Sequence, residues 1–214
     1  IFSFSFPFFS QENKKNKWKE KVEFSGFIKY MNSTSFVNLD SLITDNLIHN
    51  RIRFKAYLSD KITSTIEMRN RLFYGQATRL NSFLASSLDN DKGIVDMSYV
   101  SLDRKSLVIH SIFDRAYMRY SDEKWELTLG RQRINWGVNL AFNPNDLFNA
   151  YSLVDFDYQE RPGADAVRFQ YYNNELSSFE TAIQFGKSLD SSVIAGLWKI
   201  NKWEYDFQFL IANF

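Results

Sequence analysis

The sequence predicts an all-β protein, namely an antiparallel up-and-down transmembrane β-barrel of which this chain supplies about nine strands and so only part. Three observations lead to this expectation. Apolar and polar residues alternate with period two along most of the chain. Aromatic residues make up 17% of the 214 residues, and such side chains favour strands and membrane interfaces. Short and long connections between the expected strands alternate.

The clearest alternation covers residues 47–74 and predicts two strands joined by a short turn. One parity is apolar and the other is rich in charge. Pairing the two strands around the turn places Ile52 opposite Met68 on the apolar face. The same register places Arg53 opposite Glu67 on the charged face. One register therefore satisfies both faces, which is how a register is specified.

Similar alternation predicts the other strands and two further hairpins. In the hairpin that turns at 121–124, we expect Arg119 opposite Glu126 and Asp114 opposite Arg131. In the last hairpin, expected to turn at 201–202, Lys199 would face Glu204. The remaining strands are expected near 22–30, 167–171, 179–185, 194–200 and 203–211.

The expected connections differ in length. Those at 59–61, 121–124, 172–178 and 201–202 are short, whereas those at 31–46, 74–106 and 138–164 are long. Outer-membrane barrels combine short periplasmic turns with longer outer loops. A soluble β-sandwich, the alternative fold, also has alternating strands, but it gives no reason for sorting its loops.

The free-energy cost of exposing charged side chains to lipid decides which face of the expected barrel contacts the membrane. An Arg or Lys that faces lipid at mid-membrane costs roughly 2–4 kcal/mol. Turning Arg51, Arg53 and Lys55 to lipid would cost on the order of 6–12 kcal/mol, comparable to the stability of a whole domain. We therefore expect these three residues to face the lumen.

The two ends of the sequence lead to separate expectations. Residues 1–10 are rich in Phe and are expected to be the remnant of a signal peptide, followed by a polar segment at 11–21 and the barrel at 22–214. The alternative for residues 1–10 is a first strand with Phe at alternate positions. Because Phe214 is out of phase with Ile211, the last strand is expected to be truncated.

The segment 130–163 holds the most specific pattern. It contains G-R-Q-x-x-x-W-G at Gly130–Gly137 and N-P-x-D at Asn143–Asp146. A long aromatic connection of this kind is often functional. We expect it to fold into or over the barrel mouth as a constriction loop that includes Asn143, Pro144, Asp146 and Arg161. The alternative is a loop that packs on its neighbours outside the barrel.

These two motifs resemble those of porin-like and alginate-export-like outer-membrane proteins of Gram-negative bacteria. The resemblance covers residues 125–172; elsewhere the likeness is architectural. It implies an outer-membrane β-barrel with a polar path through the lumen. It implies no defined substrate and no catalytic residues.

The composition argues against several function classes. The net charge of +1 lacks the basic excess of nucleic-acid binding proteins, and there is no cysteine. We expect no enzyme activity and no cofactor, because common catalytic and phosphate-binding motifs are missing. His49 is expected to be a solvated wall residue. The carboxylates of Asp155 and Asp157 could bind calcium, but they fit a soluble loop better.

Two functions are compatible with these patterns. The first is a porin-like channel for passive or weakly anion-selective passage of small polar solutes. The second is a plugged outer-membrane barrel that acts as a scaffold or receptor through its long loops. Outer-membrane lipid is the expected partner, and homo-oligomerisation is left open. The side chains expected to line the path are Arg51, Arg53, Lys55, Glu67, Arg69, Arg71, Arg115, Arg119, Glu126, Arg131, Arg133, Glu204 and Asp206.

Overall fold

The computed structural model describes residues 2–4, 21–38, 41–91, 93–137, 145, 147–148 and 162–213. The chain divides into two compact units. Unit 1 comprises Ile1–Lys55, Ile66–Asp91 and Asp96–Phe113. Unit 2 comprises Ala56–Thr65, Lys92–Val95 and Asp114–Phe214.

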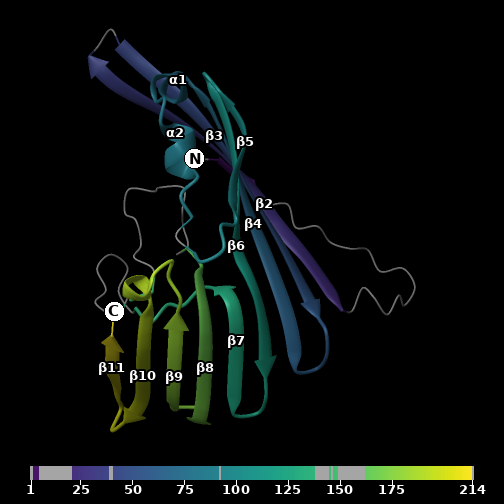
Figure 1. The fold of residues 1–214 in the computed structure, drawn as a ribbon, viewed down its shortest axis with the longest axis vertical. Coiled ribbons are helices and arrows are strands. Elements are labelled where there is room, and N and C mark those ends of the chain that lie inside the picture. Colours follow the sequence, from purple (N-terminus) through teal and green to yellow (C-terminus); the bar gives the residue numbers. More distant parts are fainter. Residues whose placement is uncertain are drawn as a thin grey trace. The chain divides into compact units, whose positions relative to one another are not determined.

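Unit 1 is built on the strands of the first half of the chain (Figure 1). Its elements are β1 (Phe2–Phe4), β2 (Val22–Asn38), β3 (Ser41–Tyr57), β4 (Ile62–Gly75), α1 (Gln76–Leu80), α2 (Leu84–Leu88), β5 (Ser98–Arg104) and β6 (Leu107–Ser121). The ends of β3, β4 and β6 belong to unit 2. The two short helices lie in the connection between β4 and β5, and α2 contacts β5.

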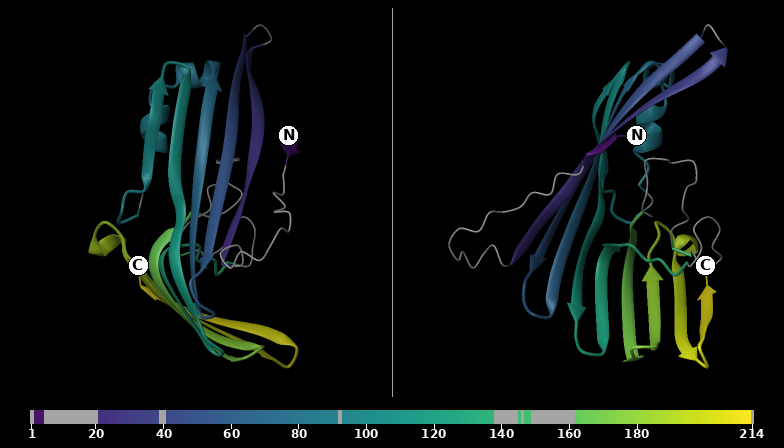
Figure 2. Two further views of the ribbon diagram at one scale, coloured as in Figure 1. Left: turned by 90° about the vertical axis from the view of Figure 1, so that its right-hand side faces the viewer. Right: turned by 180° about the vertical axis from the view of Figure 1, so that it is seen from behind.

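Unit 2 continues from β6 through the second half of the chain. Its further elements are β7 (Trp125–Gln132), β8 (Ala164–Asn174), β9 (Ser177–Gln184), the 3-10 turn η1 (Leu189–Ser191), β10 (Val193–Lys202) and β11 (Tyr205–Asn213). Strands β7 to β11 lie side by side in sequence order, as Figures 1 and 2 show. Each is antiparallel to the next, so the connection is up-and-down.

The eleven strands of the described residues form one sheet in the order β1-β2-β3-β4-β6-β7-β8-β9-β10-β11, with β5 paired to β6 beside this path. The expectation of an all-β, up-and-down chain is confirmed. The order has two ends, so the sheet is open and not a closed barrel in this part of the chain.

Strand β5, which lies inside the connection 74–106, was not expected from the sequence. Strand β1, which pairs with β2 through Phe2 opposite Tyr30, agrees with the alternative expectation of a first strand within residues 1–10. Of residues 1–10, the structure describes only Phe2–Phe4, so the signal-peptide interpretation stays a prediction. The polar segment 11–21 lies outside the described residues except for Lys21.

The long connection expected at 31–46 is wrong. Strand β2 extends to Asn38 and β3 begins at Ser41. The many polar residues here suggested a loop, but their side chains bond across the two strands. Asn46 Oδ1 accepts hydrogen bonds from the Tyr30 hydroxyl at 2.7 Å and from Asn32 Nδ2 at 2.8 Å. Cross-strand polar pairing therefore replaces the apolar alternation as the support for this hairpin.

The predicted parity of the β6–β7 hairpin holds near the turn, but the predicted register is wrong by two residues. Arg119 lies opposite Thr128, and Ser121 lies opposite Glu126. The turn closes with Asp122 N–H donating to the Trp125 carbonyl at 2.8 Å. Because the shift is even, Arg119 still reaches Glu126, at 3.4 Å along the diagonal.

The last hairpin shows a similar error. It turns at Trp203 and Glu204, not at 201–202, and Lys199 lies opposite Gln208. Both turn residues have positive φ, 57° and 64°, as a two-residue type I′ turn requires. This turn could not be predicted from the sequence, because Asn or Gly usually occupies such positions.

None of the helices in the described residues has the length and apolar character needed to cross a membrane.

Candidate functional site

Each face of the unit 2 sheet has its own chemistry. We call the face that carries Thr128, Arg168, Glu180 and Leu197 the inner face. Cross-strand pairs place these residues together, with Thr128 opposite Arg168 and Leu197 opposite Glu180. The opposite, outer face is apolar. Its exposed side chains include Leu129, Tyr171, Phe179, Ile183, Ile194, Trp198, Phe207, Phe209 and Ile211.

Glu180 is the centre of the polar network on the inner face. Its Oε1 accepts a hydrogen bond from Arg168 Nε at 2.6 Å and one from the Trp136 indole N–H. Its Oε2 accepts a bond from Gln170 Nε2 at 3.3 Å. The Glu180 side chain is buried, so this carboxylate needs such donors to compensate for its lost hydration.

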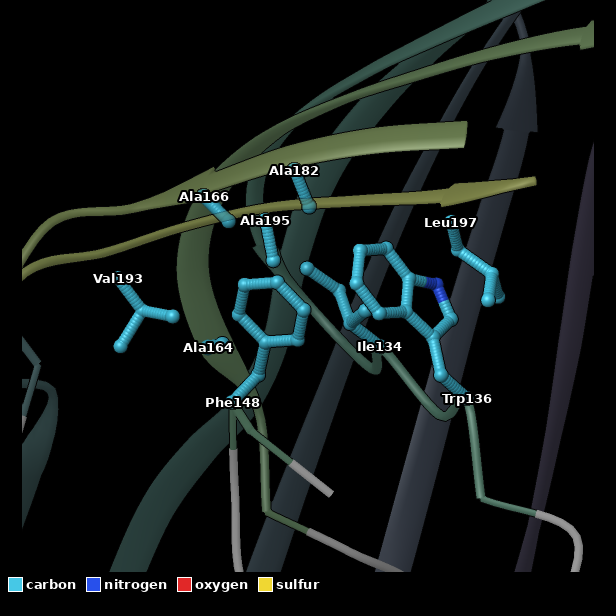
Figure 3. Close-up of a cluster of buried hydrophobic side chains, with 9 residues drawn as sticks. All are labelled: Ile134, Trp136, Phe148, Ala164, Ala166, Ala182, Val193, Ala195 and Leu197. Carbon is cyan, nitrogen blue, oxygen red and sulfur yellow. The ribbon is translucent and has the colours of Figure 1, made fainter. Parts of the chain in front are cut away.

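Trp136 belongs to the segment that leaves β7, and this segment packs on the inner face (Figure 3). The Trp136 ring contacts the Phe148 ring edge to face, with the ring centroids 4.9 Å apart. Figure 3 shows Ile134 beside these two rings in the same buried cluster. On the strands, the residues that pack against these side chains are four alanines and one leucine: Ala164, Ala166, Ala182, Ala195 and Leu197. The small side chains leave room for the bulky ones, as close packing requires.

Arg131 and Asp165 form a second buried ion pair in unit 2, with Arg131 Nε 2.7 Å from Asp165 Oδ1. They lie opposite each other on β7 and β8. Arg131 Nη2 also donates to the Val95 carbonyl at 2.8 Å, and Asp165 Oδ2 accepts from the Ile94 N–H at 2.8 Å. The pair therefore ties residues 94–95 to the sheet. The expected position of Asp114 opposite Arg131 on β6 and β7 is wrong, because Ala116 lies opposite Arg131.

Asp114 is ion-paired with its neighbour Arg115 at 3.3 Å, and both are buried. Two successive buried residues interrupt the alternation of β6. Counted by parity, Asp114 would share the face of Met118, but its carboxylate is buried beside Arg115, so parity alone fails at this position.

Gly130, the first residue of the G-R-Q motif, has φ 109°. A Cβ atom there would collide with the Ala116 carbonyl oxygen of β6. Glycine is thus required where β7 approaches β6 and turns toward the Trp136 segment.

In unit 1, we call the face of β3 and β4 that carries Arg51, Arg53, Glu67, Arg69 and Arg71 the inner face of that unit. Glu67 accepts a hydrogen bond from Arg53 Nε at 2.5 Å and lies 3.6 Å from Arg51 Nε. This confirms the predicted pairing of Arg53 with Glu67. Arg69 and Arg71 follow on β4, both buried, and Arg71 lies beside His110 of β6.

The remaining predicted residues fall in varied surroundings. Lys55 is half-buried, Arg133 is exposed, and Asp206 is exposed and accepts a bond from Asn201 at 2.7 Å. Glu204 lies in the β10–β11 turn, so its expected place in a strand wall is wrong. Asn143, Pro144, Asp146 and Arg161 lie outside the described residues.

Some residues of the network were missed by sequence reasoning. Asp165, Arg168 and Trp136 were not predicted as site residues. The parity of β8 could have placed Arg168 on the polar face, but no local signal pairs Trp136 with Glu180, 44 positions away.

The described residues contain no group of three or more His, Asp or Glu side chains arranged to hold a metal ion. Asp155 and Asp157 lie outside the described residues. Models of known protein families give no match to this chain, and neither do curated protein sequences.

Proposed function

We propose that this chain forms part of the wall of a bacterial outer-membrane β-barrel that lets small polar solutes pass, with a weak preference for anions. The observation that carries the proposal is the contrast between the two faces of unit 2. Its outer face exposes a continuous set of large apolar side chains, while its inner face carries ion pairs.

Energetics favour lipid as the environment of the outer face. Covering one large apolar side chain is worth about 1.5–3 kcal/mol. The outer face exposes many, among them Phe209 at 56% and Ile211 at 79%. Soluble monomers rarely expose contiguous apolar patches of this extent. Strands β8 and β10 have 11 and 10 residues, near the 9–11 that a tilted membrane strand needs. Barrel closure requires strands beyond those described.

Charge on the inner face supports the anion preference. In unit 2, each of four arginines has a carboxylate partner: Arg115, Arg119, Arg131 and Arg168. In unit 1, the inner parity of β3 and β4 is more basic, with Arg51, Arg53, Lys55, Arg69 and Arg71 beside Glu67. A positive wall attracts anions, and a narrow low-dielectric path screens this attraction poorly. Unit 1 is therefore the source of the proposed selectivity.

The segment with Ile134, Trp136 and Phe148 has a further role in the proposal. Its bulky side chains occupy the inner face, which would be the lumenal side of the barrel. The segment would narrow the path and leave a restricted channel. A fully plugged barrel that acts as a scaffold or receptor is the second candidate, and the same packing favours it.

Conductance in planar bilayers tests both candidates. We expect the full chain to form channels whose reversal potential in a KCl gradient indicates anion preference. Arg53→Glu combined with Lys55→Glu should abolish or invert the preference, because Arg53 is 47% exposed on the inner side. Glu123→Lys, in the exposed β6–β7 turn, is the control and should leave selectivity unchanged. If no variant conducts, the channel function is wrong and the scaffold remains.

A further inference from the structure

A pocket of about 330 Å³ lies at the end of unit 2 where the β8–β9 and β10–β11 turns are neighbours (Figure 1). The Asn201 N–H donates to the Leu176 carbonyl at 2.9 Å and so holds the two hairpins together. All residues that line the pocket belong to unit 2. Ligand sites usually have about 300–1,000 Å³, so this pocket suits a small solute.

Four polar side chains that line the pocket form one row across the inner face. Tyr172 lies opposite Ser178, which in turn lies opposite Lys199. Lys199 lies opposite Gln208 of β11. Neighbouring strands are about 4.8 Å apart, so the row offers a phenol, a hydroxyl, an ammonium and an amide at regular intervals. A polar solute could therefore form several hydrogen bonds along this row.

Lys199 supplies the only positive charge among the described residues that line the pocket. Its side chain is half-buried, and its ammonium has no hydrogen bond or ion pair within the part of the chain that the structure describes. A charge that is withdrawn from water without a partner is unfavourable. A negative group of a ligand next to Lys199 would therefore stabilise it.

Two carboxylates also line the pocket, Asp206 of β11 and Glu175 of the β8–β9 turn. Asp206 lies opposite Asn201, so it is a diagonal neighbour of Lys199 on the same face. Diagonal neighbours are within reach of a long side chain, but no ion pair joins these two described residues. Asp206 Oδ1 accepts a hydrogen bond from Asn201 Nδ2 at 2.7 Å, which leaves Oδ2 available to a ligand.

The pocket thus presents an ammonium and two carboxylates that are not paired with one another. The carboxylates would repel a simple anion, and Lys199 would repel a simple cation, whereas a solute that carries both charges complements both. We propose that the pocket binds a small zwitterion, namely a free α-amino acid, with its carboxylate on Lys199 and its ammonium on Asp206. The inference goes beyond the proposed function and does not depend on it, because binding requires no conductance.

Leucine and two of its analogues test the proposal by calorimetric titration of the full chain in lipid nanodiscs. Leucine is the probe because Leu176 and Ile200 give the pocket apolar lining. 4-Methylpentanoate lacks the ammonium of leucine, and 3-methylbutylamine lacks its carboxylate. We expect leucine to bind at least about tenfold more tightly than either analogue, the difference expected for one hydrogen bond between charged groups. Equal affinity for leucine and either analogue, or no saturable leucine binding at millimolar concentration, overturns the proposal.

Substitutions assign the binding to this pocket. Lys199→Met should weaken leucine binding by at least about tenfold, and Lys199→Arg, which keeps the charge, should recover part of it. Asp206→Asn should weaken leucine binding to a similar degree without weakening the binding of 4-methylpentanoate. Lys124→Met and Asp190→Asn change exposed charges elsewhere in unit 2, so these matched controls should bind leucine as the wild type does.

The outcomes separate the pocket from the channel. Leucine binding that is unchanged in both Lys199→Met and Asp206→Asn occurs elsewhere and overturns the proposal. If one of these variants does not fold, the other variant and the three ligands on the wild type still decide. Leucine binding by a protein that does not conduct would support the pocket and contradict the channel; conductance without leucine binding would do the reverse.

Discussion

Arg131 and Asp165 face each other across β7 and β8 through two parallel hydrogen bonds, Nε to Oδ1 at 2.7 Å and Nη2 to Oδ2 at 2.9 Å. The guanidinium side chain is 3% exposed and the carboxylate side chain 13%. This fork-to-fork geometry is the strongest form of the Arg–carboxylate contact. It joins the strand that carries the G-R-Q motif to the strand that follows the long connection.

Asp165→Asn should destabilise the protein strongly. The substitution leaves Arg131 buried without its counter-charge, and breaking one side of a buried pair typically costs about 3–5 kcal/mol. The measurement is the free energy of unfolding in urea, with the protein in lipid vesicles. Arg119→Gln is the comparison, because Arg119 is 36% exposed and 3.4 Å from Glu126; we expect it to cost less than about 1 kcal/mol. Equal costs for the two variants would contradict the assignment.

Trp136→Phe should weaken the packing of the segment on the inner face, although an aromatic ring remains at position 136. The change removes the indole N–H that donates to Glu180, and losing a donor to a buried carboxylate costs about 1–3 kcal/mol. We expect lower stability and, if the segment narrows the path, higher single-channel conductance in planar bilayers.

Trp125→Phe is the matched control for that experiment. Trp125 stacks on Tyr120 of β6, with centroids 4.8 Å apart. The Trp125→Phe substitution makes the same chemical change at a position outside the Glu180 network, so it should leave conductance unchanged. A rise in conductance in both variants would show that Trp136 has no special role in the path.

The outer face allows a test of membrane exposure that is independent of transport. Phe209→Arg should cost roughly 2–4 kcal/mol of unfolding free energy in vesicles if Phe209 lies near mid-membrane. Gln208→Arg, one residue away on the other face of β11, should cost far less. Similar values for the two would mean that neither face contacts lipid.

A contact between two turns predicts a pH dependence. Lys61 Nζ lies 2.8 Å from Asp122 Oδ1, linking the β3–β4 turn to the β6–β7 turn. The hydrogen bond from Lys61 lowers the pKa of Asp122 below its ordinary value of 3.8, and the backbone N–H of Glu123 adds to this. A lowered carboxyl pKa contributes stability that is present above the unfolded-state pKa and lost as the pH falls through the folded-state pKa.

We therefore expect the urea midpoint to decrease on acidification below about pH 3.8, with a component that is missing in Asp122→Asn. The same contact raises the pKa of Lys61, so its contribution stays present below the ordinary lysine pKa of 10.5 and is lost only at higher pH. Lys61→Gln should remove the acid component as well. An unchanged acid profile in both variants would show that the contact does not affect stability.

Which side chains share a face was determined largely by the sequence alone. Alternation is a local property of strands, so residues 47–74 correctly indicated a hairpin with Arg53 beside Glu67. The same reasoning failed at Asp114, where two successive buried residues interrupt the alternation. It also failed in the β2–β3 hairpin, where hydrogen bonds between polar side chains replace apolar pairing.

Register and partner choice were decided only by the tertiary structure. A register shift of two or four residues leaves every side chain on its original face, so alternation cannot detect it. The turn at Trp203 and Glu204 sets the register of β10 and β11. The positive φ of these two residues could not be predicted from their residue types. In the same way, the sequence allows Arg131 to pair with any carboxylate on its face. The register between β7 and β8 decides that its partner is Asp165. Faces follow from near neighbours in the chain, whereas pairs depend on where distant strands meet.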